Sequence, residues 1–304
     1  MPHLSVIIPT WNRAPETERA VQSVLSQTFQ DFEVIIADDG STDSTPLKFK
    51  DCPDPRVHYL QLEHSGLPAV ARNAGLQQAQ GEYAAFLDSD DEWLPYKLER
   101  QVEFLQQNPE IGMVCANAWI RRENIATPVT IFHAETIGSQ EWPLAELVKT
   151  NIIITSSLMA NRQSILAAGG FPQDPIFKAI EDYALWLRLT VKNRLYYLAE
   201  PLLFYADVGN SIRSQQRIED NTKGLKRLFD ELAIYTRSEP SPVKKNISIR
   251  QAGCLKDQMR IVSAKGKIKE VVNVAKQILA LEPGNIGNYK LILISIFQAL
   301  QQSN

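Results

Sequence analysis

The sequence is poor in the residues that build thiol or imidazole metal centres. The three cysteines lie far apart and form no C-x-x-C pair: Cys52, Cys115 and Cys254. The four histidines are equally scattered: His3, His58, His64 and His133. This spacing excludes a zinc ribbon and a disulfide framework. We therefore expect buried free thiols and no zinc site.

Long hydrophobic runs are also missing. The longest, LILISIFQAL at 291–300, is about half of the roughly 20 residues that span a bilayer. The amino terminus MPHLSVIIP has no basic segment before its apolar residues, so it predicts no signal peptide. We expect a cytoplasmic location.

The glycine-rich loops of common nucleotide-binding folds are absent as well. There is neither a G-x-G-x-x-G segment after a strand nor a G-x-x-x-x-G-K-[ST] loop, which argues against dinucleotide cofactors and P-loop phosphoryl transfer. The segment DSDDEW lacks the central glycine and the closing glutamate of an EF-hand, so it does not predict that type of calcium loop.

What the sequence does contain is an alternation of apolar runs and helical patterns. With 44% hydrophobic and 22% charged residues, the composition is that of a globular protein. Strand-like runs at 4–8, 32–37, 83–87 and 111–116 are separated by helical patterns at 15–27, 67–80 and 98–108. This order predicts an α/β fold with a mostly parallel sheet flanked by helices.

The second half of the chain predicts a helical region. A strand is expected at 155–160, a helix at 180–190 and an extended segment at 195–207, and from 215 on the pattern is helical with breaks at 238–242 and 282–285. Residues 1–212 contain 16 basic and 27 acidic residues, whereas residues 213–304 contain 16 and 8. We therefore expect an α/β domain at 1–212 and a basic α-helical region at 213–304.

Polar clusters follow three of the predicted strands: PTWNR at 9–13, DDGSTD at 38–43 and DSDD at 88–91. Ligands of open α/β sheets bind beyond the carboxyl ends of strands, so these clusters are expected to converge. Four carboxylates stand within five positions: Asp88, Asp90, Asp91 and Glu92. Holding them together requires positive charge among them. The alternative is that Asp90, Asp91 and Glu92 cap the helix that follows.

A cluster of carboxylates without histidine or cysteine favours a hard cation, Mg²⁺ or Mn²⁺. Such an ion on few carboxylates completes its shell with phosphate oxygens and water, which points to a phosphorylated substrate. Arg72 in GLPAVARNAGL has the planar fork that suits a diphosphate. Its alternative role is that of a solvated helix arginine.

Six segments in order resemble glycosyltransferase family 2 and its GT-A fold. They are VIIPTWNR at 6–13, VIIADDGSTDST at 34–45, GLPAVARNAGL at 66–76, GEYAAFLDSDDEW at 81–93, GGF at 169–171 and EDYALWLRL at 181–189. The resemblance covers about the first 210 residues. It implies transfer of a sugar from a nucleotide-diphospho-sugar to an acceptor hydroxyl.

The resemblance also implies a donor site. Asp39 would accept a hydrogen bond from the base, most simply the N3–H of uracil, with Asp38 supporting it. Asp88 would lie towards the ribose and the metal, and Asp90 would be a direct ligand of the Mg²⁺ or Mn²⁺ that bridges the diphosphate. The other donor-site residues are Pro9, Thr10, Trp11, Asn12, Arg13, Arg72, Asn73 and Ser89.

The ED segment would supply the general base, Asp182, with Glu181 as the alternative. From the residues alone, both are acids at a helix amino terminus. A single base without a protein nucleophile implies inversion at the anomeric carbon, so retention by a nucleophilic carboxylate is not expected. One departure from the family follows EPLLFY, where many relatives have a histidine and this chain has ADVGNSIRSQQR. Arg213 or Arg217 would then cover the diphosphate.

Two other functions remain open at this point. A nucleotide-sugar-binding scaffold without turnover would keep the fold, and intact acids argue against it. A sugar nucleotidyltransferase would have a glycine-rich loop where this chain has PTWNR. We expect an acceptor in cell-envelope polysaccharide or lipid-linked glycan synthesis. The basic tail would be a set of solvated helix faces, a peripheral contact with the inner face of the membrane, or a homodimer interface.

Overall fold

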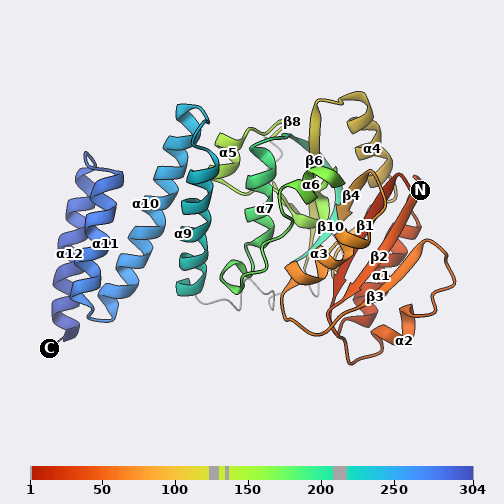
Figure 1. The fold of residues 1–304 in the computed structure, drawn as a ribbon, viewed down its shortest axis with the longest axis horizontal. Helices are drawn as coiled ribbons and strands as arrows, with labels where there is room; N and C mark the ends of the chain where they lie inside the picture. Colours follow the sequence, from red (N-terminus) through yellow and green to blue (C-terminus); the bar gives the residue numbers. More distant parts are fainter. Residues whose placement is uncertain (1, 123–129, 134–136, 208–217, 304) are drawn as a thin grey trace. The chain divides into compact units, whose positions relative to one another are not determined.

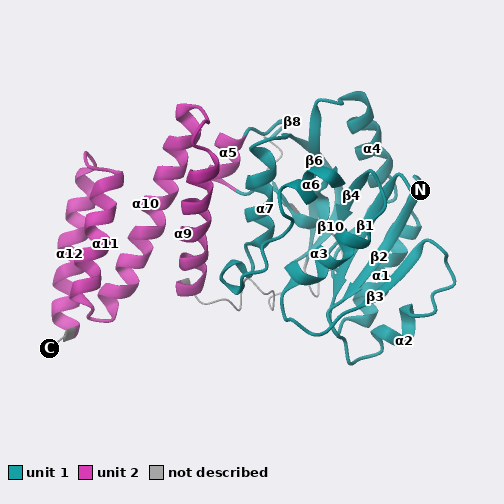
Figure 2. Ribbon diagram, in the orientation of Figure 1, with its two compact units in different colours: residues 1–143, 151–214 teal, residues 144–150, 215–304 magenta. Residues whose placement is uncertain are grey.

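A computed structural model of the chain describes residues 2–122, 130–133, 137–207 and 218–303 (Figure 1). The chain divides into two compact units (Figure 2). Unit 1 comprises Met1–Pro143 and Asn151–Ser214, and unit 2 comprises Leu144–Thr150 and Gln215–Asn304. The boundary predicted between 212 and 213 falls outside the described residues.

Unit 1 is built on a sheet with the strand order β3-β2-β1-β4-β9-β6-β10-β5. Its strands are β1 (Leu4–Thr10), β2 (Phe32–Asp38), β3 (Val57–Gln61), β4 (Tyr83–Phe86), β5 (Glu92–Trp93), β6 (Ile111–Arg122), β9 (Met159–Asn161) and β10 (Arg194–Asp207). Two short strands pair off this path, β7 (Thr130–Ile131) with β6 and β8 (Gln140–Glu141) with β10.

The neighbours β3, β2, β1 and β4 are parallel, as are β6 and β10, whereas β9 is antiparallel to both β4 and β6. All residues of β1 and β2 are buried, as strands covered on both faces should be. The predicted α/β fold with a largely parallel sheet flanked by helices is confirmed.

Helices separate the strands of unit 1. They are α1 (Ala14–Leu25), α2 (Thr45–Phe49), α3 (Pro68–Gln78), α4 (Lys97–Gln107), α6 (Arg162–Ala167) and α7 (Glu181–Thr190), with short 3₁₀ turns η1 (Thr155–Ser157) and η2 (Pro175–Phe177). Those predicted at 15–27, 67–80, 98–108 and 180–190 correspond to α1, α3, α4 and α7, whereas α2 and α6 were not predicted. Gly75 lets α3 lie close to β1, because a Cβ there would be 2.7 Å from Ile7 Cγ2. A larger residue at 75 would push the helix off the strand.

The parallel register brings the carboxyl ends of β2 and β1 together, since Thr10 pairs with Asp38. Strand β4 joins them through the pair Ile7 and Phe86. The segments 9–13, 38–43 and 88–91 therefore leave the sheet at one edge, as the sequence predicts.

Unit 2 consists of α5 (Leu144–Lys149), α9 (Ile218–Tyr235), α10 (Ser241–Ala264), α11 (Ile268–Leu281) and α12 (Ile286–Ser303). The predicted helical region and its breaks are confirmed, because α9 ends before 238–242 and α11 and α12 are separated by 282–285. Its last three helices share a core that includes Leu255, Met259, Val271, Ile278 and Ala299. Among the described residues, no helix has the length and apolar character needed to cross a membrane.

Candidate active site

Two carboxylates of the DSDD segment are paired with arginines. Arg72 Nη2 donates to Asp88 Oδ1 at 2.7 Å, and Arg13 Nη1 donates to Asp90 Oδ2. The side chains of Asp88 and Asp90 remain 31% and 24% exposed. Arginine therefore offsets the repulsion between these acids, and both carboxylates are still accessible to a solute.

The third acid of the segment, Asp91, is buried. It accepts hydrogen bonds from Ser156 Oγ and, at 2.8 Å, from the backbone N–H of Ala206. Burial raises the pKa of Asp91 well above its ordinary value, and the charges of Asp90 and Asp88 raise it further. Asp91 therefore anchors the segment to the fold.

The helix-capping interpretation of these acids is wrong. Helix α4 begins at Lys97, its N-cap residue is Tyr96, and no side chain caps it. Glu92 instead contacts Arg121 and lies 3.5 Å from Arg19 Nε. Each acid of the run thus has a partner of its own.

Arg72 joins two motifs that are far apart in the sequence. Its Nη1 donates to Glu181 Oε1 at 2.8 Å while Nη2 donates to Asp88. The guanidinium also lies over the ring of Phe171, 5.3 Å from its centroid. The side chain is 7% exposed, so Arg72 is a buried bridge between the D-x-D and E-D segments and not a solvated helix arginine.

Asp182, the predicted base, lies beside this bridge at the start of α7. Its Oδ2 accepts a hydrogen bond from Thr155 Oγ1 at 2.8 Å. Burial raises the pKa of Asp182; the charge of Arg72 opposes this effect and the charge of Asp88 adds to it. The net result is a carboxylate that binds a proton more strongly than an ordinary aspartate, as a general base should.

Glu181, the alternative base, has a different environment. Burial raises its pKa, whereas Arg72 lowers it through the ion pair. Glu181 is therefore tied to Arg72 through Oε1, whereas Asp182 Oδ2 accepts from the neutral hydroxyl of Thr155.

The turn η1 was missed by sequence reasoning. Its Thr155 holds Asp182, and its Ser156 Oγ accepts from the backbone N–H of Asp88 at 2.9 Å and donates to Asp91. The strand predicted at 155–160 begins only at Met159, where β9 starts. Adjacent hydroxyls in TSS were the available signal, because such side chains bind backbone and carboxylate groups in turns.

Neutral hydrogen-bond donors surround Asp38, the last residue of β2, and Asp39, which follows it. Asp38 Oδ1 accepts from the backbone N–H and the hydroxyl of Ser41, and Oδ2 accepts from the Tyr59 hydroxyl. Asp39 accepts from the N–H and hydroxyl of Ser65 at 2.9 and 2.7 Å and from the N–H of Gly66 at 2.8 Å. Both acids are buried, so they fix the loops at 39–41 and 64–66.

The PTWNR segment is tied to these loops. Pro9 and Thr10 lie buried at the end of β1. Asn12 has a φ of 51°, and its Oδ1 accepts from the N–H groups of Thr42 and Asp43 at 2.7 and 3.2 Å. A left-handed asparagine is tolerated when its side chain satisfies nearby backbone groups in this way.

Trp11 is 48% exposed and stacks on His64, with ring centroids 4.6 Å apart. His64 Nδ1 lies 3.1 Å from Asp39 Oδ2. The two rings form a flat surface beside the acids that follow β2.

Two predicted site residues are enclosed by the fold. Asn73 exchanges two hydrogen bonds with the backbone of Phe171, at 2.8 and 2.9 Å, and so holds the GGF loop to α3. Ser89 is buried within the DSDD segment. Arg213 and Arg217 lie outside the described residues.

The donor atoms fit a hard cation at Asp88 and Asp90. No group of three or more histidine, cysteine, aspartate or glutamate side chains is arranged to hold a metal within the described ranges. Arg72 engages one oxygen of Asp88 and Arg13 one oxygen of Asp90, and both acids are partly exposed, so these two side chains are the candidates for holding such an ion. Two carboxylate oxygens leave most of the coordination shell to phosphate and water, which is typical of Mg²⁺ with nucleotides.

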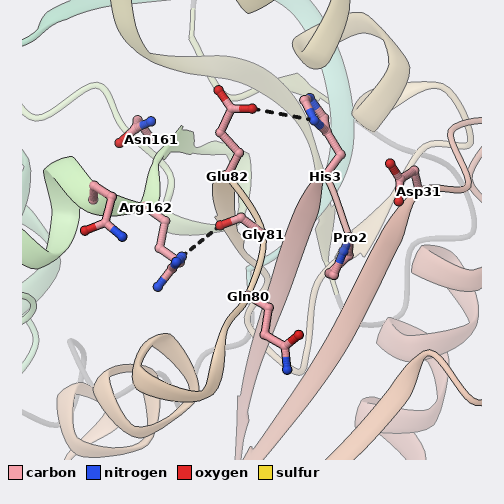
Figure 3. Close-up of a pocket in the computed structure, with 9 residues that line it drawn as sticks. Pro2, His3, Asp31, Gln80, Gly81, Glu82, Asn161 and Arg162 are labelled. Atoms are coloured by element: carbon pink, nitrogen blue, oxygen red, sulfur yellow. Dashed lines mark hydrogen bonds and ion pairs between the residues drawn. The ribbon is translucent and has the colours of Figure 1, made fainter.

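A separate hollow lies at the opposite edge of the sheet (Figure 3). It is lined by residues before β1, β2 and β4, where His3 Nδ1 lies 3.7 Å from Glu82 Oε2 and Arg162 Nε donates to the carbonyl of Gly81 at 2.8 Å. The predicted site residues do not line it. The chemistry of this unit is therefore concentrated at the carboxyl edge.

The largely parallel sheet, with its site residues beyond the carboxyl ends of the strands, can now be compared with known proteins. The family model described as Glycosyl transferase family 2 matches residues 5–167. The chain therefore belongs to glycosyl transferase family 2.

Two relatives show how much of the chain is shared. TuaG of Bacillus subtilis (strain 168), a glycosyltransferase assigned to teichuronic acid biosynthesis, is 36% identical over 218 residues, which cover 71% of this chain and 83% of TuaG. WfgD of Escherichia coli, a UDP-Glc:alpha-D-GlcNAc-diphosphoundecaprenol beta-1,3-glucosyltransferase, is 31% identical over 237 residues, which cover 77% of this chain and 87% of WfgD.

Solved structures share the fold at lower identity. Residues 1–349 of S. aureus TarS in complex with UDP-GlcNAc superpose with a TM-score of 0.72 at 18% identity, covering 98% of this chain and 89% of that one. This chain covers 54% of the length of a longer TarS structure. The mannosyltransferase PcManGT of Pyrobaculum calidifontis, in complex with GDP-Man and Mn²⁺, gives a TM-score of 0.60 at 19% identity, covering 99% of this chain and 86% of that one.

Proposed function

We propose that this glycosyltransferase moves a sugar from a UDP-linked donor to an acceptor hydroxyl with inversion at the anomeric carbon. The observation that carries the proposal is the Arg72 bridge, which brings the accessible acid Asp88 and the E-D segment to one place. The residues that bind the donor and the residue that acts as general base must lie on opposite sides of the anomeric carbon. The Arg72 bridge connects these two groups of residues.

The donor would lie across the carboxyl edge of β1, β2 and β4. Asp88 and Asp90 would hold Mg²⁺ or Mn²⁺, which when bound supplies positive charge to the leaving diphosphate. Arg13 pairs with Asp90 and is 38% exposed, so its guanidinium is free to turn towards a phosphate. The flat surface of Trp11 and His64 would contact the base, next to Asp39.

Asp182 would act on the acceptor. It would take the proton of the acceptor hydroxyl as that oxygen forms a bond to the anomeric carbon, while the bond from that carbon to the diphosphate oxygen breaks and the electron pair leaves with the nucleotide. Thr155 holds Asp182 in place throughout. One displacement without a protein nucleophile inverts the anomeric configuration.

We infer an acceptor from cell-envelope polysaccharide or lipid-linked glycan synthesis. The support comes from the relatives, since the name of TuaG refers to teichuronic acid and that of WfgD to a diphosphoundecaprenol acceptor. The choice of UDP has similar support in WfgD and the TarS complex, whereas PcManGT was solved with GDP-Man.

Calorimetric titration tests the donor site directly. The protein is titrated with UDP, GDP and dTDP, each with Mn²⁺ and again with EDTA, alongside the variants Asp90→Ala and Glu82→Ala. We expect one nucleotide to bind with metal, and this binding to be lost in Asp90→Ala and kept in Glu82→Ala, whose acid lies at the opposite edge of the sheet. Absence of nucleotide binding in every condition would overturn the donor site and the sugar transfer proposed for it.

A further inference from the structure

The outward face of α12 is apolar. Five large side chains recur at spacings of three and four residues and are between 48% and 83% exposed: Ile286, Tyr289, Leu293, Phe297 and Leu300. Residues at these spacings lie on one face of a helix. The other side of α12 packs against α10 and α11, where Ala299 is fully buried and Ser263 Oγ donates to the carbonyl of Ser295 at 2.7 Å. Helix α12 thus has two apolar faces: one is packed in the core of unit 2, and the other is exposed.

The neighbouring helix α11 provides the contrast. Its exposed residues are mainly polar, as expected for a surface helix: Lys269, Glu270, Asn273, Lys276 and Gln277, with Val272 among them at 40% exposure. Helix α12 therefore exposes five large apolar side chains on one face where α11 exposes one; elsewhere in unit 2 the exposed ones are Ile234, Tyr235 and Ile249. Contiguous apolar patches of this kind mark interaction sites.

Charge identifies the kind of partner that fits this face. Helix α12 contains no acidic residue, and its single charged side chain, Lys290, is exposed on the same face, one turn from Ile286 and from Ile294. Two copies packed through this face by a two-fold axis would each carry Lys290 into the interface, where an unpaired charge is costly. A lipid surface accepts the same lysine, because its stem lies along apolar groups while its ammonium reaches a lipid phosphate.

The part of the sequence that contains α12 has a net positive charge, which agrees with an anionic partner. Residues 213–304 contain 16 basic and 8 acidic residues. Basic residues near a bilayer strengthen its binding to anionic headgroups, and tyrosine is favoured at the boundary between headgroups and acyl chains. An exposed apolar face on a helix of 18 residues is long enough to lie along such an interface while the opposite side stays packed against α10 and α11.

We propose that α12 binds the surface of an anionic lipid bilayer, with its apolar residues in the headgroup boundary and Lys290 at the lipid phosphates. This inference goes beyond the proposed function. It would place the enzyme on the surface where a lipid-linked acceptor resides, and it does not depend on which nucleotide or sugar is used.

Vesicle co-sedimentation of the full chain tests the proposal. Vesicles of phosphatidylcholine mixed with phosphatidylglycerol are compared with vesicles of phosphatidylcholine alone. We expect binding to the mixed vesicles, weaker binding to the neutral ones, and a decrease with added salt. The variant Leu293→Glu/Phe297→Glu should bind at least about tenfold more weakly, and Lys290→Gln about fivefold more weakly.

The matched control is Val272→Glu/Asn273→Glu, which adds the same two negative charges at exposed positions of α11 and should bind like the unaltered chain. Failure of the unaltered chain to bind mixed vesicles, or equal binding by Leu293→Glu/Phe297→Glu, would overturn the proposal. Sedimentation velocity adds a second readout: a dimer that this variant converts to a monomer would assign the face to self-association instead. Titration of the variant with UDP separates the two proposals, because α12 is no part of the donor site.

Discussion

The acidic segments that follow β2 and β4 hold their carboxylates in different ways. Asp38 and Asp39 are buried and accept hydrogen bonds from hydroxyl and backbone groups of nearby loops. Asp88 and Asp90 are partly exposed and face arginines. Buried hydrogen bonds to a charge contribute strongly to stability, whereas accessible ion pairs contribute little and exchange readily. The first segment is therefore suited to fixing loops. In the second, Asp90 is suited to exchanging Arg13 for a ligand, whereas Asp88 is paired with the buried Arg72.

The largest effect is expected at Asp182. This acid combines the two environments, because it has a neutral hydrogen-bond donor and also charged neighbours. Asp182 has the neutral donor Thr155 and the charged neighbours Arg72 and Asp88. We expect Asp182→Asn to lower kcat by about 10²- to 10⁴-fold. The measurement is nucleotide release with a donor and acceptor, and unchanged kcat would remove Asp182 from the mechanism.

The same variant should not lose stability at neutral pH. The folded-state pKa of Asp182 is raised above its unfolded value, so the ionised carboxylate destabilises the fold. This cost is absent below the unfolded pKa, grows as pH rises towards the folded pKa and is complete above it. Asp182→Asn should therefore match or exceed the unaltered chain in unfolding free energy at pH 7, as measured in urea.

A second experiment compares one acid from each segment. Asp38→Ala leaves Ser41 and Tyr59 without their acceptor and should lower the unfolding free energy by about 2 to 3 kcal/mol. Asp90→Ala removes an accessible ion pair and should change it by less than about 1 kcal/mol. Urea unfolding of both variants measures the difference, and equal losses would contradict the distinction between the two segments.

A smaller effect concerns the pH profile. The hydrogen bond from Thr155 lowers the pKa of Asp182 within an environment that raises it overall. Thr155→Val should therefore move the acidic limb of the kcat/KM profile to higher pH, because the base is protonated earlier as pH falls. Ser157→Ala is the control, since Ser157 donates to the carbonyl of Ile154 within the same turn. A shift of equal size in both variants would assign the effect to the turn.

The smallest effect is expected at Arg13. Its ion pair with Asp90 joins side chains that are 38% and 24% exposed, so solvent screens it. Arg13→Ala should lower the unfolding free energy by less than about 1 kcal/mol at low salt and by still less at high salt. A double-mutant cycle with Asp90→Ala measures the coupling free energy between Arg13 and Asp90. A coupling free energy that added salt does not reduce would contradict a solvent-screened pair.

The sheet was predictable because buried parallel strands leave a strong pattern. The continuous apolar runs at 4–8 and 32–37 fall within β1 and β2, and the polar segments that follow them lie at one edge of the sheet. The turn η1 was not predictable in the same way. Its residues Thr155 and Ser156 leave the strand pattern because their hydroxyls bind carboxylates from 27 and 65 positions away in the sequence.

The pairing within the candidate site was also beyond sequence reasoning. A cluster of acids signals that positive charge is needed, but it does not show whether a metal or an arginine provides it. Arg72 reaches Asp88 and Glu181 only because α3, β4 and α7 meet in the fold. Asn73, one position further along α3, is instead used by the backbone of Phe171.

The stacked pair of Trp11 and His64 gives the protein an intrinsic optical probe. Of the five tryptophans, Trp11 is exposed, while Trp93 and Trp186 are buried and the other two are half-buried. A collisional quencher in solution would therefore act chiefly on Trp11, and a ring that displaces His64 from it would change its emission. Occupancy of the carboxyl edge of the sheet could be followed by fluorescence without a label.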